Sequence, residues 1–169
     1  MEYIAHRINT IKQLLDLPEN CGLEVDLRDH HSKVILQHEP FQDGENFEEF
    51  LKYYKHQTII LNIKSERIEH KVLEILKKYN VKKYFFLDSS FPMINIMTKE
   101  KESNIALRFS EYEGIDTILT MAGKIKWVWV DCFTQLPINK QNFKILKDHG
   151  FNLCLVSPEL QNQDNKIEA

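Results

Sequence analysis

The amino-acid sequence predicts a compact (β/α)8 TIM barrel, in which eight strands each lead to a helix. Two observations favour this fold. Short apolar segments with strand character alternate with amphipathic segments along most of the chain. The alternation gives eight expected strands, the number that closes such a barrel. An open doubly wound sheet is the alternative, but no Gly-rich phosphate loop follows any of the expected strands.

The eight expected strands are brief and are spread over the whole sequence. They are Tyr3–His6, Gly22–Arg28, Lys33–His38, Thr58–Lys64, Lys83–Asp88, Asn104–Phe109, Lys126–Asp131 and Asn152–Ser157. The 169 residues are few for this fold, which usually needs about 200 or more, so the connections must be short. No linker or repeat divides the sequence, and residues 1–169 are therefore expected to form a single domain.

Helical patterns fill most of the connections between these strands. Asn9 or Thr10 is expected to be the N-cap of the first helix. Gly150 is expected to be the C′ residue of the helical segment "NKQNFKILKDHG". The clearest helix starts after Ser65, its expected N-cap, and carries a continuous apolar stripe. The stripe consists of Ile68, Val72, Ile75 and Leu76.

Two segments depart from the alternation of strands and helices. Only "DHHS" separates the second and third expected strands, so they must form a direct hairpin. The last segment, "SPELQNQDNKIEA", predicts a shortened polar helix from Pro158, with only Leu160 and Ile167 available for packing. We expect apolar surface to stay uncovered there and a homodimer to cover it.

Composition excludes several functional classes. The net charge is −3 and no long basic run occurs, which argues against nucleic acid as a partner. No apolar run approaches the roughly 20 residues of a transmembrane helix, and no secretory signal is recognisable. The three cysteines, Cys21, Cys132 and Cys154, are far apart, which favours a reducing cytoplasm over a disulfide or zinc framework.

Polar residues interrupt the apolar strands in a regular way. In "GLEVDLR", side chains alternate between the two faces, so that Glu24, Asp26 and Arg28 share one face. The same parity in the strand that ends near residue 64 places Asn62 and Lys64 on one face. A buried carboxylate is costly unless it is paired or bound to a metal. Glu24, Asp26 and Asn62 offer the oxygen ligands that Mg²⁺ or Ca²⁺ prefers.

Further polar residues stand at or near the ends of the expected strands. His6 and His38 can transfer protons near neutral pH. Three cationic side chains could hold a phosphate group, namely Arg7, Arg28 and Lys64. Trp129 belongs either to the core or to the wall of a substrate pocket. Together these residue types suit hydrolysis of a small phosphodiester that is assisted by a divalent metal.

The spacing of these residues resembles that of the glycerophosphodiester phosphodiesterase family, which is similar to phosphatidylinositol-specific phospholipase C and sphingomyelinase D. The matching stretches are "IAHR", "GLEVDLR" and "ILQHEP", and "NIK" takes the place of the family's Glu-x-Lys. The resemblance covers residues 3–64 and is only architectural beyond them. It implies a phospholipase C-like TIM barrel with a direct hairpin between its second and third strands.

The resemblance also implies a role for each matching residue. His6 and His38 would be general acid and base, while Glu24 and Asp26 would bind the metal, with Asn62 in place of a third carboxylate. Arg7 and Lys64 would bind phosphate. In many members of the family, a hydroxyl group of the substrate attacks phosphorus and gives a cyclic intermediate.

Several departures from the family pattern leave a second interpretation open. Ile8 follows Arg7 where the family has Gly, Glu39 follows His38 where Asp is usual, and Asn62 replaces a charged ligand. A small insertion that the family carries after the third strand is also missing. The alternative is a catalytically weakened barrel that binds a phosphorylated ligand or a protein partner.

Overall fold

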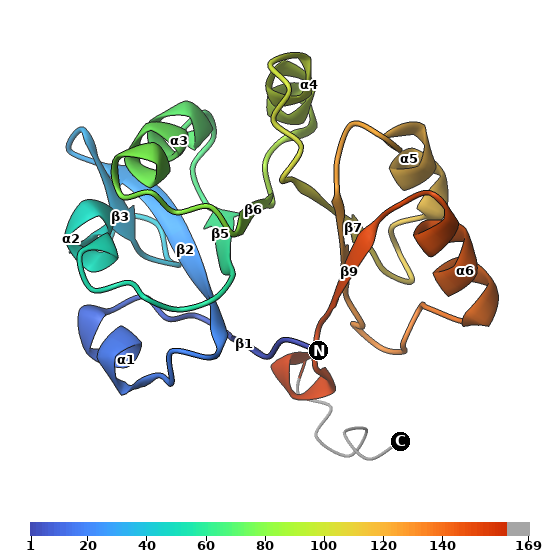
Figure 1. Ribbon diagram of the computed structural model, residues 1–169, viewed down its shortest axis with the longest axis horizontal. Helices are drawn as coiled ribbons and strands as arrows, with labels where there is room; N and C mark the ends of the chain where they lie inside the picture. The colour runs from blue at the N-terminus through green and yellow to red at the C-terminus, as the bar shows by residue number, and fades with distance from the viewer. Residues whose placement is uncertain (162–169) are drawn as a thin grey trace. The chain divides into compact units, whose positions relative to one another are not determined.

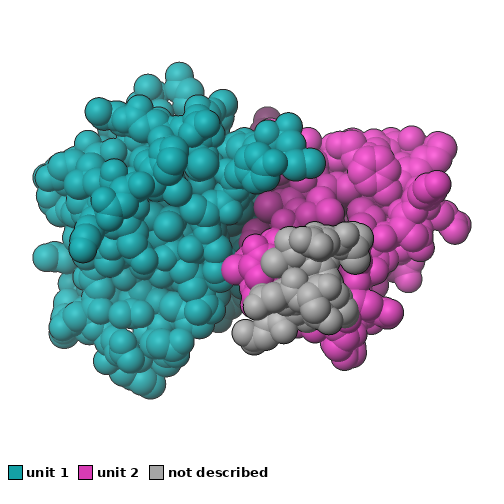
Figure 2. Space-filling model, turned by 90° about the horizontal axis from the view of Figure 1, so that it is seen from below, with its two compact units in different colours: residues 1–94 teal, residues 95–169 magenta. Residues whose placement is uncertain are grey.

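The computed structural model describes residues 1–161, which form two compact units, the first of residues 1–94 and the second from residue 95 onward (Figure 2). The first unit contains strands β1 (Ile4–Ala5), β2 (Gly22–His30), β3 (Lys33–Leu36), β4 (Glu45–Asn46), β5 (Ile59–Ile63) and β6 (Tyr84–Leu87), and helices α1 (Ile11–Asp16), α2 (Phe47–Leu51) and α3 (Glu69–Lys78). Helix α4 (Phe91–Lys99) begins in this unit and ends in the next.

The second unit contains a smaller set of elements. They are strands β7 (Ala106–Phe109), β8 (Trp127–Val130) and β9 (Asn152–Leu155), helices α5 (Ile115–Thr120) and α6 (Lys140–Asp148), and a final 3-10 turn, Pro158–Gln161. The three strands form a parallel sheet in the order β7-β8-β9. Figure 1 shows α5 and α6 on the same side of these strands.

A mixed sheet is the centre of the first unit. Its strand order is β4-β3-β2-β5-β6, and β1 pairs with the beginning of β2. Strands β2, β5 and β6 run parallel, whereas β3 turns back to pair antiparallel with β2, as expected for the direct hairpin. Helices α1, α2 and α3 lie on the same side of the β2 and β5 strands (Figure 1).

The expected (β/α)8 barrel is wrong. Each of the eight expected strands has a counterpart, but among the described residues they form two separate sheets, and no closed barrel is present. Alternation of strands and helices is common to barrels and open α/β sheets. Closure depends on hydrogen bonds between the strands that would be the sheet edges, and the alternation carries no information about these bonds.

Local sequence signals account for most of the element boundaries. Thr10 is the N-cap of α1 and forms a capping box with Gln13. The stripe expected on α3 is buried, but the helix begins later than expected, at N-cap Ile68, and Ser65 does not cap it. Gly150 follows the C-cap of α6 with φ of 83°, a conformation that glycine adopts without strain.

The shortened C-terminal helix is only partly covered by the structure. Residues 158–161 form the 3-10 turn, and the rest of the expected helix, including Ile167, lies outside the described residues. Leu160 is exposed. Within the described residues, no helix combines the length and the apolar character that crossing a membrane requires.

The start of β2 is packed so closely that a side chain would not fit there. A Cβ atom at Gly22 would lie 2.4 Å from Ile4 Cδ1 and 2.8 Å from the backbone oxygen of Thr58. A Cβ atom at Gly114, which caps α5, would meet nothing within 4 Å. The two glycines therefore provide a matched pair for testing the packing of β2 between β1 and β5.

We predict that Gly22→Ser lowers the free energy of unfolding by about 1–3 kcal/mol, because the backbone of β1 or β5 must move. Gly114→Ser should leave it unchanged or raise it slightly, since serine is a good N-cap. Urea denaturation followed by circular dichroism measures both variants. Equal stability of the two variants would contradict the packing described for the start of β2.

Candidate functional site

Glu24, Asp26 and Asn62 lie together on neighbouring parallel strands of the first unit. Asp26 on β2 and Asn62 on β5 are direct partners across the sheet, so their side chains leave the same face. Glu24 precedes Asp26 by two residues and shares that face. All three side chains are buried, with exposed fractions of 6% or less. The structure therefore brings together the three residues that the sequence predicts as metal ligands.

Both carboxylates are held by hydrogen bonds from defined neighbours. Asn62 Nδ2 donates to Glu24 Oε1 at 2.8 Å, and the backbone N–H of Arg7 donates to Glu24 Oε2 at 2.8 Å. Asn9 Nδ2 donates to Asp26 Oδ2 at 2.8 Å, while Asn9 Oδ1 accepts from the backbone N–H of Asp26. These bonds fix the orientation of each carboxylate before any ligand binds.

Two oxygen atoms in this cluster have no hydrogen-bond donor. They are Asp26 Oδ1 and Asn62 Oδ1, both buried, on residues that face one another across the β2–β5 pair. An unsatisfied buried polar atom costs about 1–3 kcal/mol. Rotating the amide of Asn62 would not remove the cost, because its nitrogen would then leave Glu24. The site thus keeps two hard oxygen atoms that accept no hydrogen bond within its interior.

Lys64 brings a positive charge close to Asp26 Oδ1. Its Nζ lies 3.5 Å from Asp26 Oδ1 and 3.6 Å from Asp88 Oδ2, where β5 and β6 end. Asp88 has φ of 61°, an uncommon conformation for a residue other than glycine. Lys64 therefore bridges a buried and a partly exposed carboxylate, and one end of the site carries a cation.

The charges around Glu24 act on its protonation. Burial, followed by the neighbouring charge of Asp26, raises the pKa of the Glu24 carboxyl to about 7. His6 Nε2 lies 3.8 Å from Glu24 Oε2. Burial and the charge of Arg7 lower the pKa of His6, so its neutral form is favoured near neutral pH. An uncharged His6 can accept a proton.

His38 has a defined tautomer. The guanidinium Nη2 of Arg7 lies 3.0 Å from His38 Nε2, and because arginine can only donate, Nε2 is the acceptor. His38 Nδ1 then donates to Glu39 Oε1 at 2.6 Å. The histidine also lowers the pKa of the Glu39 carboxyl through this hydrogen bond. Glu39 therefore orients the imidazole so that Nε2 points toward Arg7.

Arg7 connects the two histidine positions. Its φ of 56° lies in the left-handed region, which is uncommon for a residue other than glycine. In this conformation its backbone N–H reaches Glu24 while its guanidinium reaches His38. His6, Arg7 and His38 thus meet at the mixed sheet of the first unit, as the sequence predicts.

The remaining predicted substrate ligands occupy other surroundings. Arg28 donates from Nε and Nη2 to the backbone oxygen of His38 and from Nη1 to that of Lys64, so it ties together the segments that follow β3 and β5. Trp129 belongs to the second unit, where it is buried on β8 and donates from Nε1 to Asp131 Oδ2 at 3.3 Å.

Three residues of this cluster were not assigned a role from the sequence. Asn9 binds Asp26 twice, Glu39 orients His38, and Asp88 holds Lys64. Glu39 and Asp88 each carried a signal, since one directly follows a predicted catalytic residue and the other ends an expected strand. For Asn9 the sequence carried no signal that would distinguish its binding to Asp26 from helix capping.

Within residues 1–161, no group of three or more His, Cys, Asp or Glu side chains is arranged to hold a metal ion. A cation at this site would therefore need the neutral amide oxygen of Asn62 as its third protein ligand. The donor set fits a hard cation in kind, because two of its buried oxygen atoms accept no hydrogen bond.

No model of a protein family matches the sequence, and no curated protein matches it. The geometry of the site and the resemblance in residues 3–64 are therefore the observations on which a function can be argued.

The raised pKa of Glu24 predicts how stability depends on pH. The unfolded chain releases this proton near 4.5 and the folded chain near 7. Folding therefore retains a proton between these values, so the metal-free protein should lose stability as pH rises from 4.5 past 7. We expect Glu24→Gln to remove this loss, which should be about 3 kcal/mol.

Urea denaturation at pH 5 and pH 8 in the presence of a chelator measures the effect. Glu74→Gln, a change at an exposed glutamate on α3, is the matched control and should follow the parent protein at both pH values. If Glu24→Gln keeps the full pH dependence of the parent, another group is responsible and the protonation described for Glu24 is incorrect.

Proposed function

We propose that this protein is a phosphodiesterase that uses a divalent cation and two histidines to cleave a small phosphodiester. One observation carries the proposal above all others: Asp26 and Asn62, direct partners across β2 and β5 beside Glu24, each bury an oxygen atom that accepts no hydrogen bond. The same residues take part in the resemblance to glycerophosphodiester phosphodiesterases. The proposal concerns the chemistry of the site and does not depend on a closed barrel.

The three oxygen donors would hold the cation. Mg²⁺ and Ca²⁺ prefer carboxylate and carbonyl oxygens, and Asp26, Asn62 and Glu24 supply both kinds. When bound, such a cation polarises a phosphoryl oxygen and offsets the charge that develops on it. Glu24 and Asp26 would also be relieved of their mutual repulsion. The residues around them would then bind the phosphate and move protons.

Arg7 and Lys64 would bind the phosphate. Charge-assisted hydrogen bonds to an anion are roughly twice as strong as neutral ones, so a phosphate should replace the neutral His38 as the partner of the Arg7 guanidinium. Replacement would free His38 Nε2 for proton transfer. Lys64 would approach the same anion from the ends of β5 and β6.

His6 and His38 would transfer the two protons. One imidazole takes a proton from the attacking hydroxyl group as its oxygen bonds to phosphorus. The other gives a proton to the oxygen of the leaving alcohol as its bond to phosphorus breaks. The low pKa of His6 suits the base, and Glu39 keeps His38 in one tautomer. The attacking hydroxyl would come from water or from the substrate itself.

The expected partner is therefore a small phosphodiester rather than nucleic acid, given the net charge of −3. Cys21, Cys132 and Cys154 form no disulfide bond, which is consistent with the proposed cytoplasmic location. A homodimer would cover exposed apolar side chains near the end of the described chain, such as Leu155 and Leu160.

A second function, binding of a phosphorylated ligand without turnover, is favoured by Lys64. Its ammonium group already lies 3.5 Å from Asp26 Oδ1, and it supplies part of the charge that a metal would bring. A site of this kind would bind an anion through Arg7 and Lys64 but would lack the cation needed for cleavage. Hydrolysis and metal binding separate the two functions.

We expect hydrolysis of at least one member of a phosphodiester panel in the presence of Mg²⁺, Mn²⁺ or Ca²⁺. His6→Ala and His38→Ala should each lower turnover by about 10²–10⁴-fold, the usual contribution of positioned acid–base catalysis. His149→Ala, which changes an exposed histidine after α6, is the control and should retain full activity. Absence of hydrolysis by the parent protein would favour the binding function instead.

Asp26→Asn should lower the affinity for Ca²⁺ or Mg²⁺ by at least about tenfold, because it removes the charge of one oxygen ligand. Isothermal titration calorimetry measures the affinity directly and needs no substrate. Asp116→Asn, on α5 in the second unit, should bind the metal as the parent protein does. Unchanged affinity in Asp26→Asn would mean that the metal binds at another place.

A further inference from the structure

Glu69 is a fully buried carboxylate in the first turn of α3, and it takes no part in the hydrogen bonds around Asp26. Its exposed fraction is 0%, and neither Oε1 nor Oε2 accepts a hydrogen bond. Among residues 1–161, no cationic side chain forms an ion pair with it. A carboxylate in such surroundings needs a partner, because buried charges in proteins are paired or bind metal ions.

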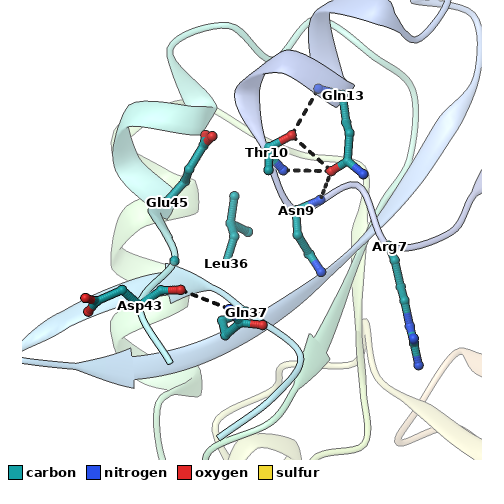
Figure 3. A pocket seen from close by; sticks show the side chains of 9 residues that line it. Arg7, Asn9, Thr10, Gln13, Leu36, Gln37, Asp43 and Glu45 are labelled. Carbon is teal, nitrogen blue, oxygen red and sulfur yellow. Dashed lines mark hydrogen bonds between the residues drawn. The ribbon is translucent and has the colours of Figure 1, made fainter. Parts of the chain in front are cut away.

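The pocket beside Arg7 shows how polar side chains elsewhere in the first unit avoid this problem (Figure 3). It has a volume of about 530 Å³, and at its edge Gln13 Oε1 accepts from the backbone N–H groups of Asn9 and Thr10. Gln13 is exposed, so water can satisfy its remaining amide group. Bulk water does not reach Glu69, and its two oxygens depend on a partner inside the protein.

The helix dipole stabilises the charge of Glu69 only in part. A carboxylate in the first turn of a helix gains from the positive end of the dipole, and this gain is smaller than the cost of burying an unpaired ion. A further positive charge is therefore needed beside Glu69.

Glu69 lies on the side of α3 that faces the connection from β6 to α4. Glu69 and Lys78 are separated by about two and a half helical turns, so they stand on opposite sides of the helix. Lys78 contacts Glu48 on α2, which places α2 on the side away from Glu69. On the side of Glu69, the preceding residue Glu66 accepts from Ser90 Oγ at 2.8 Å.

Ser89 belongs to this connection and carries a second buried oxygen without a partner. Its Oγ forms no hydrogen bond, either with Glu69 or with any other group. The connection is held in place from below, since Asp88 Oδ2 lies 3.6 Å from Lys64 Nζ at the ends of β6 and β5. Two buried oxygens on neighbouring segments that do not bond to one another are what an ion between them would produce.

The charge of these groups decides which cation fits. Glu69 brings one negative charge and Ser89 a neutral hydroxyl, and within residues 1–161 no third His, Cys, Asp or Glu completes a cage. A divalent ion would keep an uncompensated positive charge in the interior, which is costly. A monovalent ion balances the single carboxylate, and oxygen ligands suit K⁺, which channel filters bind through carbonyl oxygens.

We infer that Glu69 and Ser89 bind a monovalent cation, Na⁺ or K⁺, at the carboxyl ends of β5 and β6. The site is separate from Asp26 and Asn62, and it does not depend on the proposed function. Because Ser89 directly follows Asp88, the ion would also fix the carboxylate that holds Lys64.

Urea denaturation at neutral pH in the presence of EDTA measures the binding without any substrate. Choline chloride is replaced stepwise by NaCl or KCl at constant ionic strength, so that only the identity of the cation changes. Stability should rise with NaCl or KCl, and the folding equilibrium constant should increase about tenfold once the salt reaches ten times its dissociation constant.

Glu69→Gln keeps the shape of the side chain but removes its charge, and it should abolish the response to both salts. Ser89→Ala removes one oxygen ligand and should raise the half-saturating salt concentration about 3- to 10-fold. Glu74→Gln, an exposed glutamate on the same helix, is the control and should respond as the parent protein does.

A parent protein that is equally stable in the three salts would overturn the inference. A response that Glu69→Gln retains in full would also overturn it, because the ion would then bind elsewhere. Should Glu69→Gln fail to fold, Ser89→Ala decides the matter: a raised half-saturating concentration supports the site, and an unchanged one overturns it.

Discussion

The pairing of Asp26 with Asn62 across two parallel strands is the constraint on which the rest of the site depends. It buries two oxygen atoms that accept no hydrogen bond. The ammonium group of Lys64, 3.5 Å from one of them, offsets part of the cost, and folding must offset the rest elsewhere. Glu24 is buried beside Asp26. Burial, followed by the charge of Asp26, raises the pKa of the Glu24 carboxyl to about 7. Arg7, Asn9 and Lys64 are arranged around this acidic centre. A site that carries such an internal cost is better explained by a ligand than by stability.

The sequence allowed the local structure and the cluster to be predicted, because both follow from short-range rules. The alternation in "GLEVDLR" places Glu24 and Asp26 on one face, and the same parity brings in Asn62. The strand positions and the β2–β3 hairpin follow from apolar runs and from a connection too short for a helix. Ser65 failed as a cap because helix α3 begins three residues later than the capping signal implied.

The fold class could not be derived by the same means. Whether strands close into one barrel depends on hydrogen bonds between edges that are distant in sequence, and the strand pattern does not encode them. The orientation of His38 by Glu39 and the bonds from Asn9 to Asp26 likewise depend on side-chain directions in three dimensions. The histidine cluster was predicted from its spacing, but its electrostatics, including the lowered pKa of His6, needed the burial and distances of the folded chain.

A crystal of this protein grown with Ca²⁺ tests the central claim most directly, since anomalous scattering locates the ion independently of any activity. The account predicts one peak within about 2.3–2.6 Å of both Asp26 Oδ1 and Asn62 Oδ1, the usual range for calcium–oxygen bonds. Lys64 should lie farther from Asp26 there than the present 3.5 Å. A saturating Ca²⁺ concentration that leaves no peak between these two oxygens would contradict the account.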